Sequence, residues 1–198
     1  MGQRGKTMPA QTLAHRAVLS AKYLLNWQLI EKIIEMLETH NTGFSMQHQQ
    51  QTQWCWSATS VSTSHFYNAA STWTQCALVN DQLGQTTCCV DGSTNQCNQP
   101  NVLNTPLNKV GCLDSYQAGT IPFNDVKTRI NGGHPVAVRI GWSGGGGHFV
   151  VIGGYIDNAS ETLLIRDPWY GDNSISYNDF LTKYQGTGSW THTYFTKA

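Results

Sequence analysis

The chain has 198 residues, and its 12 Lys and Arg residues balance 12 Asp and Glu residues, so its formal net charge is zero. A chain of this length is most simply one domain, here with an additional arm, and it can bury a sizeable core without metals or disulfides. The neutral balance provides no basic surface for nucleic acid or an anionic membrane. No segment reaches the ~18 apolar residues that a membrane span needs. The composition therefore argues against a nucleic-acid-binding or membrane-spanning protein.

Residues 9–40 are predicted to form a helix, because apolar side chains recur along them at steps of three and four residues. The members of this stripe are Tyr23, Trp27, Ile30, Ile34 and Leu37. Gly43 is a plausible stop. We expect residues 1–43 to be a helical arm that docks on its own domain, or that serves as a pro-segment or a partner-binding arm. The main domain is then residues 44–198.

The main domain changes character along the chain. We expect a helix from about Cys55 to Tyr67, irregular structure with short helical turns over 70–100, and short helices at 101–111 and 121–131. After residue 134, β-branched runs separated by turn residues predict strands at 136–140, 148–156, 162–167 and 191–197. A short helix or loop is expected at 177–184. Helices first and strands later, with short connections, indicate an α+β fold with an antiparallel sheet.

The six cysteines leave several pairings open. They are Cys55, Cys76, Cys88, Cys89, Cys97 and Cys112. If Cys55 is a free thiol, the other five fit either two disulfides and one spare thiol or five reduced thiols. Because the chain has no CxxC pair and Cys88 is adjacent to Cys89, a zinc site is disfavoured. We therefore expect no metal.

Cys55 lies between two tryptophans in the stretch QHQQQTQWCWSATS, at the predicted start of a helix. A cysteine is nucleophilic only as the thiolate, which a helix N-terminus and a nearby histidine stabilise. Of seven histidines, His134 and His148 both follow Gly-Gly. His134 precedes a proline at a strand entry, the ordinary position of a turn residue. His148 follows a glycine run and opens a strand, which gives its ring a defined and unobstructed place.

Asp167 ends the strand that follows the one opened by His148. In an antiparallel hairpin the end of one strand lies beside the start of the other, so we expect Asp167 and His148 to come together. A catalytic imidazole needs such a group to fix its tautomer and orientation. Trp169, two residues further on, is placed to cover their hydrogen bond from water.

With these residues in place, the sequence resembles the bacterial papain-like cysteine peptidases, in particular the bacteriocin-leader-processing and plant-effector branches. The resemblance covers roughly residues 44–196. In that superfamily a glutamine six residues before the nucleophile supplies an oxyanion-hole donor, which corresponds to Gln49. The nucleophile is followed by Trp and small residues, as Cys55 is by Trp56. Asp167 and Trp169 match the orienting residue and its shielding tryptophan, although papain itself has Asn at the former position.

The resemblance implies a papain-like fold, a helical half packed on an antiparallel sheet, and a cysteine endopeptidase acting through a thioester. It implies Cys55, His148 and Asp167 as catalytic residues, Gln49 in the oxyanion hole, and Trp56 and Trp169 in support. Gln50, Gln51 and Gln53 are rivals for the oxyanion role. The substrate is then a peptide or protein, and no cofactor is expected. His148 follows Cys55 by 93 positions, fewer than the ~130–150 of cathepsin-type enzymes, so cleft specificity does not carry over.

Two other functions remain open from the sequence. The same thiol chemistry serves a transglutaminase-like acyltransferase or a deamidase, which differ only in the acyl acceptor. Alternatively, Cys55 pairs with another cysteine in a disulfide-stabilised binding module whose tryptophans make the contacts. No apolar run with a small-residue cleavage site follows Met1, so no standard signal peptide is indicated. The uncharged polar composition is compatible with secretion or delivery as an effector, and otherwise with a cytoplasmic location.

Overall fold

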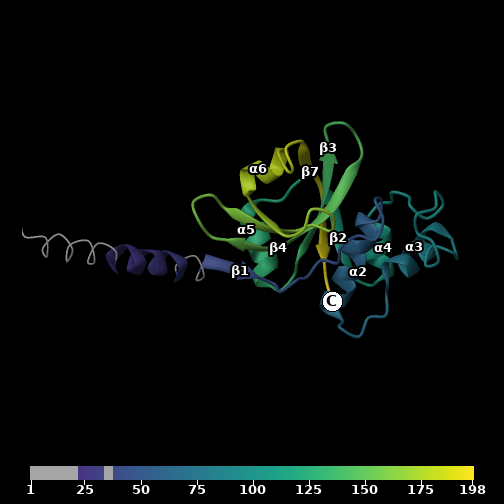
Figure 1. Ribbon diagram of the computed structural model, residues 1–198, viewed down its shortest axis with the longest axis horizontal. Helices are drawn as coiled ribbons and strands as arrows, with labels where there is room; N and C mark the ends of the chain where they lie inside the picture. The colour runs from purple at the N-terminus through teal and green to yellow at the C-terminus, as the bar shows by residue number, and fades with distance from the viewer. Residues whose placement is uncertain (1–21, 34–37) are drawn as a thin grey trace, which may run out of the picture. The chain divides into compact units, whose positions relative to one another are not determined.

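The computed structural model describes residues 22–33 and 38–198 (Figure 1). The chain divides into two compact units, Met1–Glu38 and Thr39–Ala198. Residues 22–33 are helical, in agreement with the prediction, whereas 9–21 and 34–37 of the predicted helix lie outside the described residues. The end of that predicted helix is wrong, because Thr39–Asn41 form strand β1 and pair with β4. In the part of the chain that is described, no helix combines the length and the apolarity that crossing a membrane requires.

The second unit is built on one antiparallel sheet, whose order is β2-β7-β3-β4-β5-β6 with β1 paired to β4. Its strands in the described chain are β1 (Thr39–Asn41), β2 (Leu113–Ala118), β3 (Val136–Trp142), β4 (Gly147–Ile156), β5 (Thr162–Arg166), β6 (Asn173–Ser176) and β7 (Gly188–Thr196). The β3, β4, β5 and β7 strands follow the predicted runs. Strands β2 and β6 were not predicted from the sequence.

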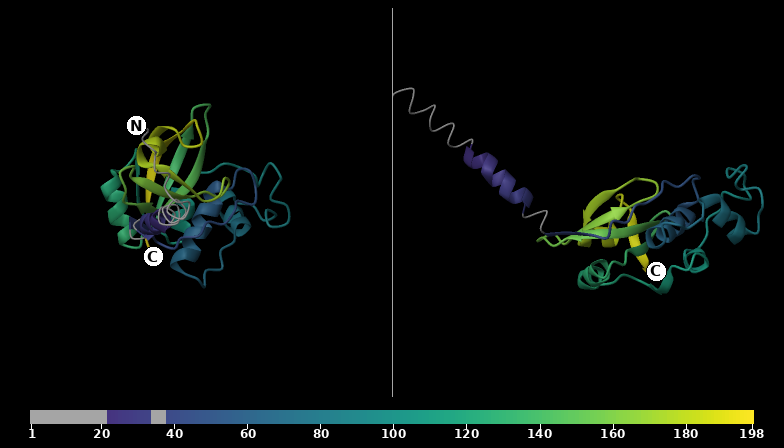
Figure 2. Two further views of the ribbon diagram at one scale, coloured as in Figure 1. Left: turned by 60° about the vertical axis from the view of Figure 1, so that its left-hand side comes forward. Right: turned by 90° about the horizontal axis from the view of Figure 1, so that it is seen from below.

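Helices cover both faces of the sheet (Figures 1 and 2). They are α2 (Cys55–Tyr67), α3 (Gln75–Leu83), α4 (Asn104–Lys109), α5 (Phe123–Asn131) and α6 (Tyr177–Thr182). One core cluster joins α2, α3 and α4 to residues such as Ala137 and Val151, and the other joins α5 and α6 to Val138 and Ile152. Because side chains alternate along a strand, β3 and β4 supply both cores and are apolar at nearly every position. The α+β prediction is confirmed.

Helix α2 is the buried element that carries Cys55. Its first ten residues are all buried, and most of them are Ser, Thr or Ala. Small side chains let the helix lie close against β4. Some of their hydroxyls bond within the helix, as when Ser60 Oγ donates to the Trp56 carbonyl at 2.9 Å, and others bond outside it, as when Ser57 Oγ donates to the Gln75 carbonyl at 2.9 Å. The observed bounds of α2 agree with the predicted ones.

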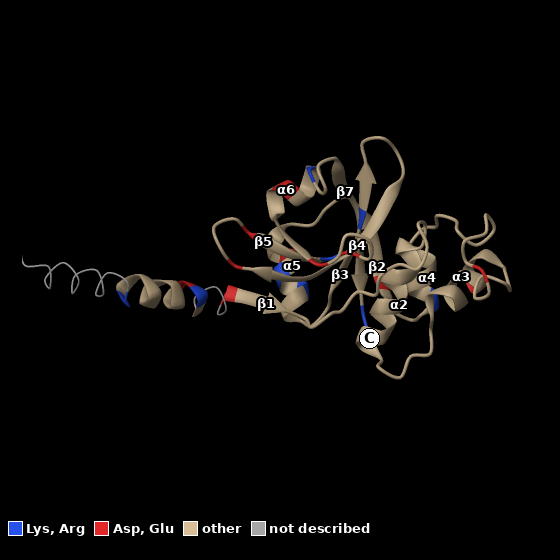
Figure 3. Cartoon of the chain, viewed as in Figure 1, with Lys and Arg blue, Asp and Glu red and all other residues tan. Residues whose placement is uncertain are grey.

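The stretch expected to be irregular, 70–100, contains α3 and two disulfides. Cys76 bonds to Cys89 and Cys88 to Cys97, which corresponds to the predicted option of two disulfides with one spare thiol. Charged residues are sparse and of mixed sign over the second unit, Thr39–Ala198 (Figure 3). The fold is therefore held by two apolar cores and two cross-links rather than by ion-pair networks.

Candidate active site

Cys55 is the first residue of α2, and nothing caps the helix there. The N-cap residue Trp54 makes no side-chain cap hydrogen bond, and the first turn holds no acidic residue. The backbone N–H groups of a first turn have no partner within the helix. They can therefore stabilise a negative charge at the Cys55 sulfur or at an oxyanion beside it. The thiol is 8% exposed and lines two adjoining cavities.

His148 is held at the start of β4 by a glycine turn. Gly145 and Gly146 have φ of 94° and 78°, in the left-handed region that favours glycine, and they close the hairpin between β3 and β4. The His148 ring is buried, and its Nε2 lies 2.8 Å from Asp167 Oδ1. The antiparallel register of β4 with β5 produces this contact, as the sequence analysis expected. The Cys55 thiol lines the same cavity as the ring and is one of the groups that raise the pKa of His148.

The Asp167 carboxylate is buried, and both of its oxygens accept hydrogen bonds. Its Oδ1 also accepts the backbone N–H groups of Trp169 at 2.7 Å and Tyr170 at 2.9 Å. Its Oδ2 accepts the Tyr184 hydroxyl at 2.7 Å. Tyr184 was not predicted as a site residue. No local pattern around it indicates that the segment between α6 and β7 packs against Asp167. This set of donors fixes the carboxylate and, through it, the plane of the imidazole.

The three groups shift one another's protonation. Burial lowers the pKa of His148, but hydrogen bonds and charge from Asp167 and Cys55 outweigh it and raise that pKa from 6.5 to about 9. Burial raises the pKa of Asp167, yet the bond to His148, its positive charge and the Tyr170 and Tyr184 donors bring it below its usual 3.8. The arrangement therefore favours an imidazolium at His148 beside the Asp167 carboxylate at neutral pH.

Aromatic rings enclose the histidine. Trp142 stacks on His148 with ring centroids 6.1 Å apart, and Tyr170 meets the same ring edge-on at 6.1 Å. The Trp169 ring, predicted to cover the His148–Asp167 bond, is 45% exposed and stacks on His48. Rings from β3 and from the turn after Asp167 therefore limit water access to the imidazole.

The predicted supporting residue Trp56 lies in the core cluster beneath Cys55. Its side chain has no exposed surface, and its Nε1 donates to the Gln99 carbonyl at 3.0 Å. The ring therefore connects the nucleophile helix to the segment that follows the second disulfide.

Gln49 lies in the same cavity as Cys55 and His148. Its buried amide Nε2 donates to the carbonyls of Gln51 at 2.8 Å and Thr52 at 2.9 Å. Donation to an oxyanion requires that the amide share or release one of these carbonyls. Among its rivals, Gln53 also lines both cavities at Cys55.

Cys55 is a free thiol, and His134, the other histidine that follows Gly-Gly, lies apart from this cluster. Within the described residues, Cys55 and Cys112 are the free thiols, so the alternative in which Cys55 forms a disulfide is wrong. His134 bonds to the hydroxyl of Tyr67, at the opposite end of α2 from Cys55. In the part of the chain that the structure describes, no group of His, Cys, Asp and Glu has metal-binding geometry.

Residues 41–197 match the family described as "Peptidase_C39 like family". Among solved structures, one similar chain is the Pseudomonas avirulence protein AvrPphB. It is 9% identical with a TM-score of 0.34, and the alignment covers 78% of this chain and 98% of that chain. No curated protein matches. Since the family match extends over most of the chain, the protein belongs to the Peptidase_C39 like family and is a papain-like cysteine peptidase.

Proposed function

We propose that this peptidase is an endopeptidase that cleaves peptide bonds through a thioester, with Cys55, His148 and Asp167 as a catalytic triad. The observation that carries the proposal is the buried His148 ring, which is bonded to Asp167 and lines one cavity with the Cys55 thiol. The pKa of the ring is raised by Asp167 and by Cys55. A thiol beside an imidazole that a carboxylate orients has the arrangement that makes a thiolate.

Each group has a defined role in the proposed reaction. His148 takes the thiol proton, and the Cys55 sulfur attacks the substrate carbonyl to form a tetrahedral oxyanion. The Cys55 backbone N–H and the Gln49 amide donate to that oxyanion. The C–N bond then breaks as His148 gives its proton to the leaving amine, which leaves a thioester on Cys55. A water, deprotonated by His148, attacks the thioester and releases the acid and the thiol.

The two free cysteines provide a matched pair of variants. Cys112 is buried, and burial raises the pKa of its thiol, which makes it a poor nucleophile. We expect Cys55→Ala to abolish cleavage of a peptide library and Cys112→Ala to leave it unchanged. Mass spectrometry of the products distinguishes the chemistry, because hydrolysis yields two fragments that together gain one water. Intact peptides with a deamidated glutamine or a cross-link would instead indicate the transferase or deamidase function.

The roles of the two predicted domains belong to the same proposal. Residues 44–198 carry every group named in the reaction, and residues 1–43 are the arm. Tyr23, Trp27 and Ile30 of its apolar stripe are exposed, while Ile34 and Leu37 lie outside the described residues. Deleting residues 1–38 keeps β1 and the sheet intact. Faster cleavage by this truncated protein would assign the arm an inhibitory role, and an unchanged rate would leave it a docking element.

A further inference from the structure

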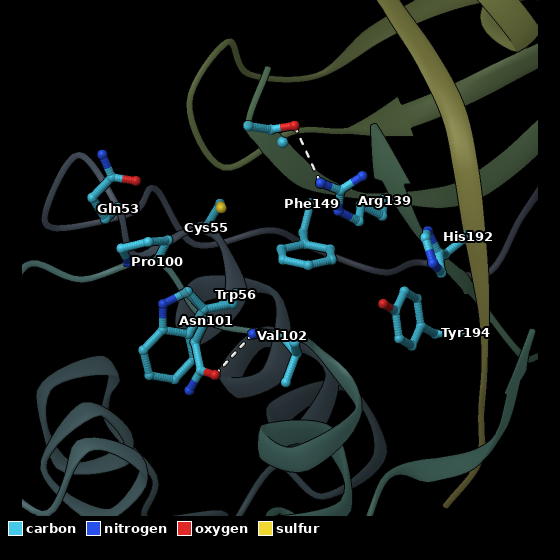
Figure 4. Close-up of a pocket in the computed structure, with 12 residues that line it drawn as sticks. Gln53, Cys55, Trp56, Pro100, Asn101, Val102, Arg139, Phe149, His192 and Tyr194 are labelled. Carbon is cyan, nitrogen blue, oxygen red and sulfur yellow. Dashed lines mark hydrogen bonds between the residues drawn. The ribbon is translucent and has the colours of Figure 1, made fainter. Parts of the chain in front are cut away.

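Two cavities adjoin Cys55, and they differ in what surrounds them. The larger, about 480 Å³, has Trp56, Val102, Arg139, Phe149, His192 and Tyr194 among its lining residues (Figure 4). The smaller, about 320 Å³, is lined by Gln49, Trp142, His148, Trp169 and Tyr170. Cys55 and the glycines at 146 and 147 line both. The sulfur therefore lies where the two cavities meet.

The proposed reaction assigns a side of the substrate to each cavity. His148 must reach the leaving amine to protonate it, so the leaving side of the scissile bond occupies the cavity that His148 lines. The acyl side, which stays bonded to Cys55, then extends into the larger cavity. We call that cavity the acyl pocket. This step rests on the proposed function.

Arg139 is the cation of the acyl pocket. Its guanidinium donates to Thr191 Oγ1 at 3.0 Å and to the Gly146 carbonyl at 3.2 Å, which uses two of five N–H groups. Within the described residues it forms no ion pair with a carboxylate, and no described residue lining the pocket is Asp or Glu. Its charge is thus uncompensated next to the nucleophile.

The backbone holds Arg139 at this place. On β3 it pairs with Phe149 of β4 on one side and His192 of β7 on the other, and both line the pocket with it. A Cβ at Gly147 would lie 2.7 Å from Arg139 Nη2 and 2.9 Å from the Ile140 carbonyl oxygen. Glycine at 147 therefore leaves room for the guanidinium in its observed position.

The other side of the pocket is apolar. Phe149 and Tyr194 supply aromatic surface, Val102 adds an aliphatic wall, and the buried Trp56 ring lies beneath (Figure 4). A site with an apolar floor and a guanidinium at one side suits a side chain with a short hydrocarbon stem and a carboxylate. A carboxylate can accept two parallel N–H bonds from arginine, and such bonds strengthen where water is excluded.

We propose that the acyl pocket selects an acidic residue, glutamate or aspartate, on the acyl side of the scissile bond, and that Arg139 is the specificity-determining residue that binds it. The partner chemistry is therefore a carboxylate-bearing peptide segment.

The test uses matched peptides built on one sequence that the wild-type protein cleaves. Glutamate and glutamine are compared at each position on the acyl side, so that charge changes and size does not. At one position glutamate should give about tenfold higher kcat/KM than glutamine, as one charge-assisted bond predicts. Arg139→Gln should remove this difference, and Arg139→Lys should keep part of it. Equal kcat/KM for the two residues at every acyl-side position, or the same preference in Arg139→Gln, overturns the proposal.

A second measurement separates this inference from the proposed function. Binding of the same peptide pair to the Cys55→Ala variant, measured by calorimetry, needs no turnover. Tighter binding of the glutamate peptide that is lost with Arg139→Gln supports the pocket even if the wild type cleaves nothing, an outcome that would overturn the endopeptidase. Cleavage that depends on Cys55 with no charge preference overturns the pocket and leaves the endopeptidase standing. The glutamate–glutamine comparison in the wild type also holds if the Arg139 variants fail to fold.

Discussion

The Tyr184 hydroxyl donates to Oδ2 of Asp167 at 2.7 Å, which leaves the other carboxylate oxygen to His148. Tyr184 follows α6, and its own oxygen accepts Asn173 Nδ2 at 3.1 Å. A buried carboxylate without donors would take up a proton, but here the donors keep the pKa of Asp167 below 3.8. Burial and the Asp167 charge in turn raise the pKa of Tyr184, so the tyrosine remains a donor at every working pH. His148 is the main group that keeps Asp167 anionic, and the Tyr184 hydroxyl adds to its effect.

We expect Tyr184→Phe to weaken both stability and catalysis. The free energy of unfolding should fall by about 1.5–3 kcal/mol, because a buried hydrogen bond to a charged group is lost. Urea denaturation measures this value. Because the pKa of Asp167 is depressed in the folded protein, ionised Asp167 contributes to the free energy of unfolding above pH 3.8. This contribution is lost as pH falls through the folded pKa, and Tyr184→Phe should lose it at a higher pH than the wild type.

Tyr177→Phe is the matched control for Tyr184→Phe. The Tyr177 hydroxyl donates at 2.9 Å to the neutral carbonyl of Ile121. The Tyr177→Phe substitution should lower the free energy of unfolding by less than Tyr184→Phe does, and it should leave kcat unchanged. Equal effects of the two variants on kcat would contradict a positioning role for Tyr184.

The raised pKa of His148 predicts the alkaline limit of activity. The thiolate–imidazolium pair should persist until His148 loses its proton, so kcat/KM should fall with an apparent pKa near 9. Because the folded pKa lies above 6.5, the contribution of this pair to stability is complete below pH 6.5 and is lost as pH rises through about 9. Asp167→Asn removes a charge that raises the pKa of His148, and should move the alkaline limit down by about 1–3 units. The pH profile of alkylation at Cys55 measures this shift, and an unmoved limit would show that Asp167 does not set it.

The elements that carry Cys55, His148 and Asp167 were predictable because each combines a local pattern with a clear boundary. The run HFVVIGGYI after four glycines is apolar at nearly every position, as a strand buried on both faces must be. The missed strands β2 and β6 have the mostly polar sequences LDSYQA and NSIS, and β2 is largely exposed whereas β6 is half-buried. They are extended because β7 and β5 each offer an edge with which they pair. Pairing with a distant strand produces no apolar periodicity in the sequence, so it could not be predicted.

The partners of the site residues were less predictable than the residues themselves. Spacing identified Gln49 but not the carbonyls of Gln51 and Thr52 that hold its amide. Likewise, the ring stacked on His148 is Trp142, which is 27 residues before Trp169 in the chain. These contacts depend on how loops return to the sheet.

Gln49→Ala should lower kcat by about 10²–10³, the usual cost of losing one oxyanion donor, with KM little changed. Part of the effect has a structural origin, because two backbone carbonyls lose their donor as well. Gln53→Ala is the natural comparison, since Gln53 lines both cavities, including the one that Gln49 lines, but is exposed. Steady-state kinetics on one peptide measure both variants. A loss below about threefold for Gln49→Ala together with a large loss for Gln53→Ala would transfer the oxyanion role to Gln53.

The second disulfide supports a wall of the acyl pocket. Cys97 precedes the segment whose residues Pro100, Asn101 and Val102 line that pocket. The same segment is tied to the nucleophile helix by indole N–H donors, since Trp54 Nε1 bonds to the Cys97 carbonyl at 2.9 Å. Losing the Cys88–Cys97 bond should therefore loosen the wall while leaving the triad in place.

The double variant Cys88→Ala/Cys97→Ala should raise KM several-fold and change kcat little, because the wall binds substrate and takes no part in bond breaking. Cys76→Ala/Cys89→Ala is the matched control, because it opens a comparable loop that begins in α3, away from the pocket wall. Each variant should lose about 2–3 kcal/mol of unfolding free energy through the entropy of the released loop. Calorimetric unfolding checks that the two losses are similar, so that any difference in KM reports the wall. Equal KM values in the two variants would mean that the cross-links serve stability alone, and that the indole contacts of Trp54 and Trp56 are sufficient to hold the segment against α2.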